Sequence, residues 1–141
     1  MATLSNFEEL DIWKKARDLC KRIYSITYYE NFSRDYRFVA QIRAAAGSIM
    51  DNIAEGFELE NNKEFIRFLF ISKGSCGEVR SQLIRANDCH YISDEELAEL
   101  KNFALELSSN ISKFIQYLQK SNIAGNKHNI PRQFSNLQIF K

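Results

Sequence analysis

The chain has 141 residues, of which 45% are apolar and 26% charged, and its net charge is +1. These values are typical of one globular domain, and near-neutrality argues against a strong electrostatic attraction to nucleic acid or anionic membrane. The sequence contains neither a basic start followed by an apolar core nor an apolar run of about 18 residues, so no signal peptide or membrane span is predicted. The three widely spaced cysteines, Cys20, Cys76 and Cys89, are typical of reduced thiols, and we expect a cytoplasmic protein.

The first predicted helix runs from Glu8 to Tyr28, because apolar residues recur there at steps of three and four. Its far side carries lysines and arginines, and tyrosines follow at its end. Such a surface can bind phosphate and stack a base, although the same pattern more often marks a solvated helix face with locally paired charges.

The second predicted helix spans Asp35 to Glu55, and Gly56 follows at a position suited to a left-handed cap. Apolar or small residues cover most of its circumference, and only three residues between Phe38 and Gly56 are charged. A helix of this kind is usually buried on more than one side. We therefore expect it at the centre of a bundle, at a subunit interface, or both.

The third predicted helix begins after Asn61, which has Glu64 at capping-box spacing. One apolar face runs from Phe65 to Ala86, and His90 follows it as a packed end residue. A second apolar line is formed by Ile66, Phe70, Gly77 and Ile84. One face should contact the chain's own bundle and the other a neighbouring subunit. Glycines at 74 and 77 favour either close approach of another backbone or a bend.

The fourth predicted helix begins at the capping box Ser93–Glu96 and continues to about Lys120 on a heptad pattern of apolar residues. Four long helices with short connections predict an all-α, antiparallel up-down-up-down four-helix bundle. The bundle domain is assigned to residues 1–120. Residues 121–141 are rich in Asn, Gln and Ser, and we expect a flexible C-terminal tail whose apolar residues could dock against another surface.

Several segments of this chain resemble one known family, the "four helix bundle proteins" or 23S rRNA-intervening sequence proteins, named after bacterial ribosomal-RNA insertions. The segments are Phe7–Leu19, Ile23-Tyr24, Gln41–Arg43, Ser48-Ile49, Asn52–Gly56, Glu64–Leu69 and Gly74-Ser75. The resemblance covers about residues 7–120 and implies a four-helix bundle that assembles into a homopentameric ring. The similar accessory protein of diversity-generating retroelements binds nucleic acid and a reverse transcriptase through a strongly basic surface.

The sequence lacks the spacings of metal ligands and the histidine-supported nucleophiles of common enzymes. We therefore expect no catalytic residues, no metal and no cofactor. The polar residues Gln41, Arg43, Ser48, Asn52 and Glu55 could form a ligand-binding rim. The stronger interpretation is structural, with Ser48 and Asn52 in hydrogen bonds between helices and Arg43 paired with Glu55 across an interface.

Two functions remain open. The first is a non-enzymatic oligomeric scaffold or adaptor that binds itself and another protein, with no membrane contact. Its candidate oligomer-interface residues are Arg43, Asn52, Glu55, Ile66, Phe70 and Ile84. The second is a nucleic-acid-binding accessory module, whose binding should be weak and salt-sensitive. Its candidate phosphate contacts are Lys14, Arg17, Lys21, Arg22, Arg80 and Arg85.

Overall fold

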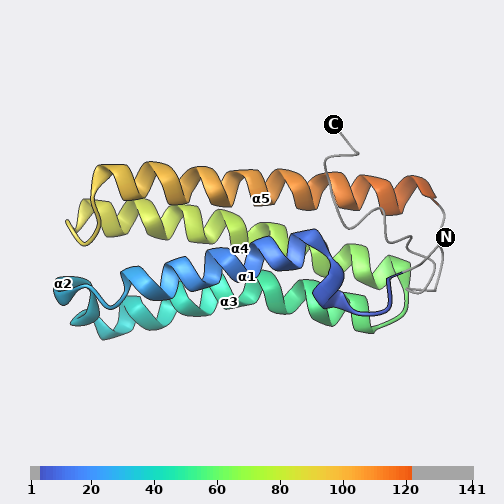
Figure 1. Cartoon of the computed structure of the whole chain (residues 1–141), viewed down its shortest axis with the longest axis horizontal. Helices are drawn as coiled ribbons and strands as arrows, with labels where there is room; N and C mark the ends of the chain where they lie inside the picture. The colour runs from blue at the N-terminus through green and yellow to red at the C-terminus, as the bar shows by residue number, and fades with distance from the viewer. Residues whose placement is uncertain (1–3, 122–141) are drawn as a thin grey trace.

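The computed structural model describes residues 4–121 of the chain. Its elements are η1 (Phe7–Glu9), α1 (Asp11–Ile26), α2 (Glu30–Ser33), α3 (Tyr36–Glu58), α4 (Asn62–Asp88) and α5 (Asp94–Ser121). No strand occurs in this part of the chain, which confirms the all-α prediction. Figure 1 shows α1, α3, α4 and α5 side by side along the long axis. Apart from Ser121, the predicted tail lies outside the described residues.

The four long helices pack around one apolar core. The α3 helix packs against α1 and α4, α4 also packs against α5, and α1 contacts α5. Most residues that the periodicity predicts for the core of α1 and α5 are buried: Ile12, Ala16, Leu19, Ile23, Ile26, Leu100, Ala104, Leu107, Ile111, Phe114 and Leu118. Leu97, at the start of the predicted heptads, is only half-buried, and Ile115 is buried outside the predicted pattern. Removing this apolar surface from water is the main term that stabilises the bundle.

Two predicted helix starts are confirmed. The Asn61 side chain accepts a hydrogen bond of 3.1 Å from the backbone N–H of Glu64. At the start of α5, Ser93 Oγ accepts from the Glu96 N–H at 3.1 Å, and the Glu96 carboxylate accepts from the Ser93 N–H at 2.9 Å. These bonds satisfy backbone donors that a helix terminus otherwise leaves unpaired.

The predicted role of Gly56 as a helix cap is wrong. The α3 helix continues to Glu58, and Gly56 is buried inside it. A Cβ atom at Gly56 would lie 2.8 Å from Cβ of Phe68 and 3.0 Å from Cδ1 of Phe65. Gly56 therefore allows α3 and α4 to approach closely, and the left-handed turn lies at Glu60, whose φ is 55°.

His90 is also not the packed end residue that the apolar stripe predicted. The α4 helix ends at Asp88, and His90 follows it with a φ of 62° and an exposed side chain. The chain reverses direction here through a left-handed residue, so the helical period no longer sets where the side chain points.

The first predicted helix is shorter than expected at both ends. Leu10 is extended, so η1 and α1 are separate, and α1 ends at Ile26. The short helix α2 was not predicted, and its residue Phe32 is completely buried. The centre of the Phe32 ring lies 5.2 Å from that of Phe38 and 5.0 Å from that of Tyr91. This aromatic cluster closes one end of the bundle.

Candidate functional site

The second apolar line of α4 lies on the surface of the bundle. Phe70 is 53% exposed and Ile84 is 43% exposed, while Ile66 is half-buried against the core. Nothing lies within 4 Å of a Cβ atom built at Gly74 or Gly77. The close backbone approach predicted for these glycines therefore has no counterpart within residues 4–121. We call Ile66, Phe70, Gly74, Gly77 and Ile84 the α4 open face.

A polar seam joins α3 to α4 beside the core. The Ser48 and Ser75 hydroxyls are 3.0 Å apart and share a hydrogen bond. Asn52 Nδ2 donates to the carbonyl and hydroxyl oxygens of Ser48, at 2.8 and 2.9 Å. Ser72 Oγ donates to the Ile49 carbonyl at 2.7 Å. The Ser48–Ser75 bond agrees with the predicted role of Ser48 between helices, whereas the bonds of Asn52 stay within α3 and leave its predicted interhelical role without a counterpart in residues 4–121.

Arg43 on α3 contacts residues at the end of α1. Its Nε donates to Thr27 Oγ1 at 3.0 Å, and its guanidinium carbon lies 4.5 and 4.9 Å from the ring centres of Tyr24 and Tyr28. Such cation–π contacts contribute roughly 0.5–1 kcal/mol each at exposed sites. Glu55 is exposed on the same helix, and its pairing with Arg43 across an interface stays a prediction.

A polar groove of about 490 Å³ runs between α3 and α4. Its lining residues are Gln41, Ala44, Ala45, Ser48, Glu78, Ser81, Gln82 and Arg85. Gln82 is only 5% exposed, and its Nε2 donates to the Glu78 carboxylate at 3.4 Å. Gln82 Oε1 has no hydrogen-bond partner among the described residues. A buried oxygen without a donor costs roughly 1–3 kcal/mol of stability relative to a hydrogen-bonded one.

Gln82 is a groove residue that the sequence pattern did not predict, although a signal was present. Gln82 lies between Val79 and Ala86 on the apolar stripe of α4, where its spacing predicts a core residue. An amide at such a position needs partners for both its oxygen and its nitrogen. Only the packing of α3 against α4 shows that the oxygen has none.

The structure divides the six basic candidates between different surfaces. Lys14, Arg17 and Lys21 are exposed along one line of α1, and the Arg17 guanidinium lies 5.7 Å from the ring centre of Trp13. Tyr24 and Tyr28 continue this surface toward α3. In contrast, Arg80 and Arg85 lie on α4, and Arg85 lies 4.2 Å from the ring centre of Phe38.

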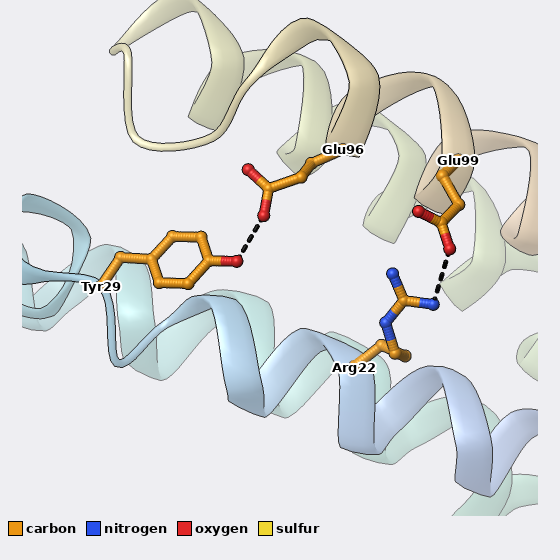
Figure 2. A network of polar contacts seen from close by, with 4 residues as sticks. All are labelled: Arg22, Tyr29, Glu96 and Glu99. Atoms are coloured by element: carbon orange, nitrogen blue, oxygen red, sulfur yellow. Dashed lines mark hydrogen bonds and ion pairs between the residues drawn. The ribbon is translucent and has the colours of Figure 1, made fainter.

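Arg22, the remaining basic candidate, is held in a polar network between α1 and α5. Figure 2 shows Arg22 pointing toward Glu99, with Nη1 at 2.9 Å from the carboxylate, while the Tyr29 hydroxyl donates to Glu96. Burial alone would raise the pKa of Glu96. The hydrogen bonds from Ser93 and Tyr29, with the positive charge of Arg22, outweigh it and lower this pKa below its ordinary value of 4.5.

A second groove, of about 450 Å³, lies between α1 and α5. Its lining residues are Lys15, Glu99, Asn102, Phe103, Glu106 and Leu107. Within residues 4–121, no group of three or more His, Cys, Asp or Glu side chains is placed to hold a metal ion. None of the helices in this range is long and apolar enough to cross a membrane.

The sequence of this helical region matches a known family over most of the chain. The family model described as "23S rRNA-intervening sequence protein" matches residues 8–113. The chain belongs to this family. A comparison of the chain with curated proteins found no match. A solved structure from Bacteroides thetaiotaomicron, described as a protein of unknown function from the S23 ribosomal protein family, is similar in fold. The two sequences are 22% identical, and the structures superpose with a TM-score of 0.68 over 74% of this chain and 98% of the Bacteroides chain.

Proposed function

We propose that this protein is a non-enzymatic scaffold or adaptor, built as a ring of identical up-down-up-down four-helix bundles. The resemblance noted above implies five copies in the ring. The members of a ring share one repeated interface, and closure keeps that interface from propagating into a filament. Each copy would then present the groove between α1 and α5 to a partner protein.

The α4 open face is the observation that carries this proposal. It combines exposed Phe70 and Ile84 with Gly74 and Gly77, over which residues 4–121 place no atom within 4 Å of a Cβ position. A mid-helix glycine costs roughly 0.5–1 kcal/mol relative to alanine, and the bundle itself offers no packing reason for it. A second chain lying against these glycines supplies such a reason, and it covers the neighbouring apolar side chains as well.

Phe70→Glu tests the proposal, with Leu59→Glu as the matched control. Both residues are exposed, at 53% and 47%, but Leu59 caps the end of α3 and lies outside the α4 open face. Because a buried unpaired charge costs several kcal/mol, Phe70→Glu should dissociate the assembly while Leu59→Glu leaves it intact. Sedimentation velocity at micromolar concentration measures both. An unchanged mass for folded Phe70→Glu would contradict the proposal.

The exposed basic line on α1 favours a second candidate, a nucleic-acid-binding accessory module. Lys14, Arg17 and Lys21 share one face with partly exposed Trp13 and with Tyr24. Cations beside aromatic rings suit a single strand, because the cations meet phosphates and the rings stack on bases. With about three contacts per subunit, binding should weaken steeply as salt rises.

Fluorescence anisotropy with single-stranded and structured RNA at several salt concentrations tests this second candidate. Lys14→Glu/Lys21→Glu should reduce both the affinity and its salt dependence, because each phosphate contact contributes a log–log slope of about −0.7 for single strands. The control is Lys63→Glu/Lys113→Glu, which makes the same charge change on α4 and α5. Equal loss in both double variants would show only a dependence on net charge and would refute a binding surface on α1.

A further inference from the structure

Within residues 4–121, the groove between α3 and α4 is lined by one carboxylate, that of Glu78. Its neighbour Gln82 is only 5% exposed and donates from Nε2 to this carboxylate at 3.4 Å. The carboxylate of Glu78, beside it, forms no ion pair within the same range. A carboxylate without an ion pair fits a guanidinium, which carries several donors in a rigid plane.

The groove also has a direction. Glu78 lies toward one end and Arg85 toward the other, separated by roughly 10 Å along the helix at about 1.5 Å per residue. The guanidinium of Arg85 rests on the Phe38 ring. Between these charges, the α3 side of the groove is formed by exposed Ala44 and buried Ala45, whose small side chains leave room for an apolar residue of another chain. A complementary surface needs a positive charge, a protruding apolar residue and a negative charge, in that order.

One ridge of α4 has this composition. Arg80, Ile84 and Asp88 follow one another at four-residue steps, which places them in a single row on the helix surface. Arg80 and Asp88 lie roughly 12 Å apart along the axis, close to the separation of the groove charges. Neither forms an ion pair within the described residues. Ile84, between them, belongs to the α4 open face and is 43% exposed.

We infer that the ridge Arg80–Ile84–Asp88 of one copy docks head to tail into the α3/α4 groove of the next copy. The neighbouring copy's Arg80 pairs with Glu78. Its Ile84 packs over Ala44, and its Asp88 pairs with Arg85. The two α4 helices run parallel in this arrangement, as they must in a ring whose axis lies along the bundle. The inference rests on the proposed self-assembly and assigns the two surfaces that join.

A charge exchange tests the pairing. Glu78→Arg and Arg80→Glu should each place like charges together at every interface and raise the dissociation constant of the assembly at least about thirtyfold. The double variant restores opposite charges and should assemble again. Residues two apart on a helix do not face each other, so the rescue cannot arise within one chain. Single variants that assemble like wild type, or a folded double variant that stays dissociated, would overturn the inference.

A mixing experiment tests the head-to-tail geometry. Ala44→Glu blocks the groove and Ile84→Glu blocks the ridge, so each variant alone should be a folded monomer by circular dichroism and light scattering. Their equimolar mixture retains one intact groove and one intact ridge, and it should form a heterodimer and nothing larger. If wild type assembles and the mixture stays monomeric, the inference fails while the proposed assembly stands. A monomeric wild type overturns both.

Discussion

Replacing Gly56 probes how closely α3 and α4 approach. A Cβ atom at this position would meet Phe68 Cβ at 2.8 Å, Phe65 Cδ1 at 3.0 Å and Phe65 Cα at 3.4 Å. Two of these neighbours are backbone or Cβ atoms, which cannot rotate away, so the helices must separate. Overpacking of this kind costs roughly 1–3 kcal/mol, and the better helix propensity of alanine returns up to about 1 kcal/mol.

The expected result for Gly56→Ala is therefore a net loss of about 1–2 kcal/mol in the free energy of unfolding. Gly47→Ala is the matched control on the same helix, because among residues 4–121 a Cβ atom there meets only the Asp51 carboxylate, at 4.0 Å. This control should gain up to about 1 kcal/mol from helix propensity alone. The two alanine variants should thus shift stability in opposite directions.

Urea unfolding followed by circular dichroism, at one fixed protein concentration, measures both changes. Gly56→Asn adds a second discrimination. Asparagine is tolerated in a left-handed cap but is larger than alanine, so in a close helix contact it should be worse than Gly56→Ala. A Gly56→Ala protein as stable as Gly47→Ala, or an asparagine variant more stable than the alanine variant, would refute the close-approach account.

Three further predictions concern single side chains. The pKa of Glu96 is lowered in the folded state, so its contribution to stability is present above pH 4.5 and is lost as the pH falls through the folded-state pKa. Tyr29→Phe removes one cause of the lowered pKa and should therefore make this loss of stability in acid smaller, as measured by urea midpoints between about pH 6 and pH 3. Burial raises the pKa of Cys76 to about 12, so iodoacetamide at neutral pH should modify exposed Cys89 and leave Cys76 unmodified until the chain unfolds. Peptide mass spectra measure both modification rates, and equal rates for the two cysteines in the folded protein would contradict this prediction. Ser72→Ala removes the bond to Ile49 and should cost about 1 kcal/mol, whereas exposed Ser109→Ala should change stability little in the same unfolding assay.

Sequence patterns predicted the features that depend only on residues close together in one helix. The caps at Asn61 and Ser93 and the heptad core of α5 follow from spacing along a single helix, and all are present. The family resemblance likewise rested on segments that the family model covers.

The features that sequence reasoning missed depend on how two helices meet. Gly56 has the spacing of a cap, but the rings of Phe65 and Phe68 make it a packing position. Gln82 has the spacing of a core residue, yet its oxygen lacks a donor because α3 supplies none at that height. Arg43 binds Thr27 and two tyrosines of the preceding helix segment, a contact set by the α1–α3 packing. Periodicity identifies a face of a helix but not the groups opposite it.

The mass of the wild-type protein in solution tests the central claim most directly. Size exclusion coupled to light scattering, across a micromolar concentration series, should give one species near five times the 16.5 kDa chain mass. A closed ring should keep that mass on dilution until it dissociates, whereas an open chain of copies would grow with concentration. A single species at 16.5 kDa throughout the series would contradict the account, because the α4 open face would then have no second copy to cover it.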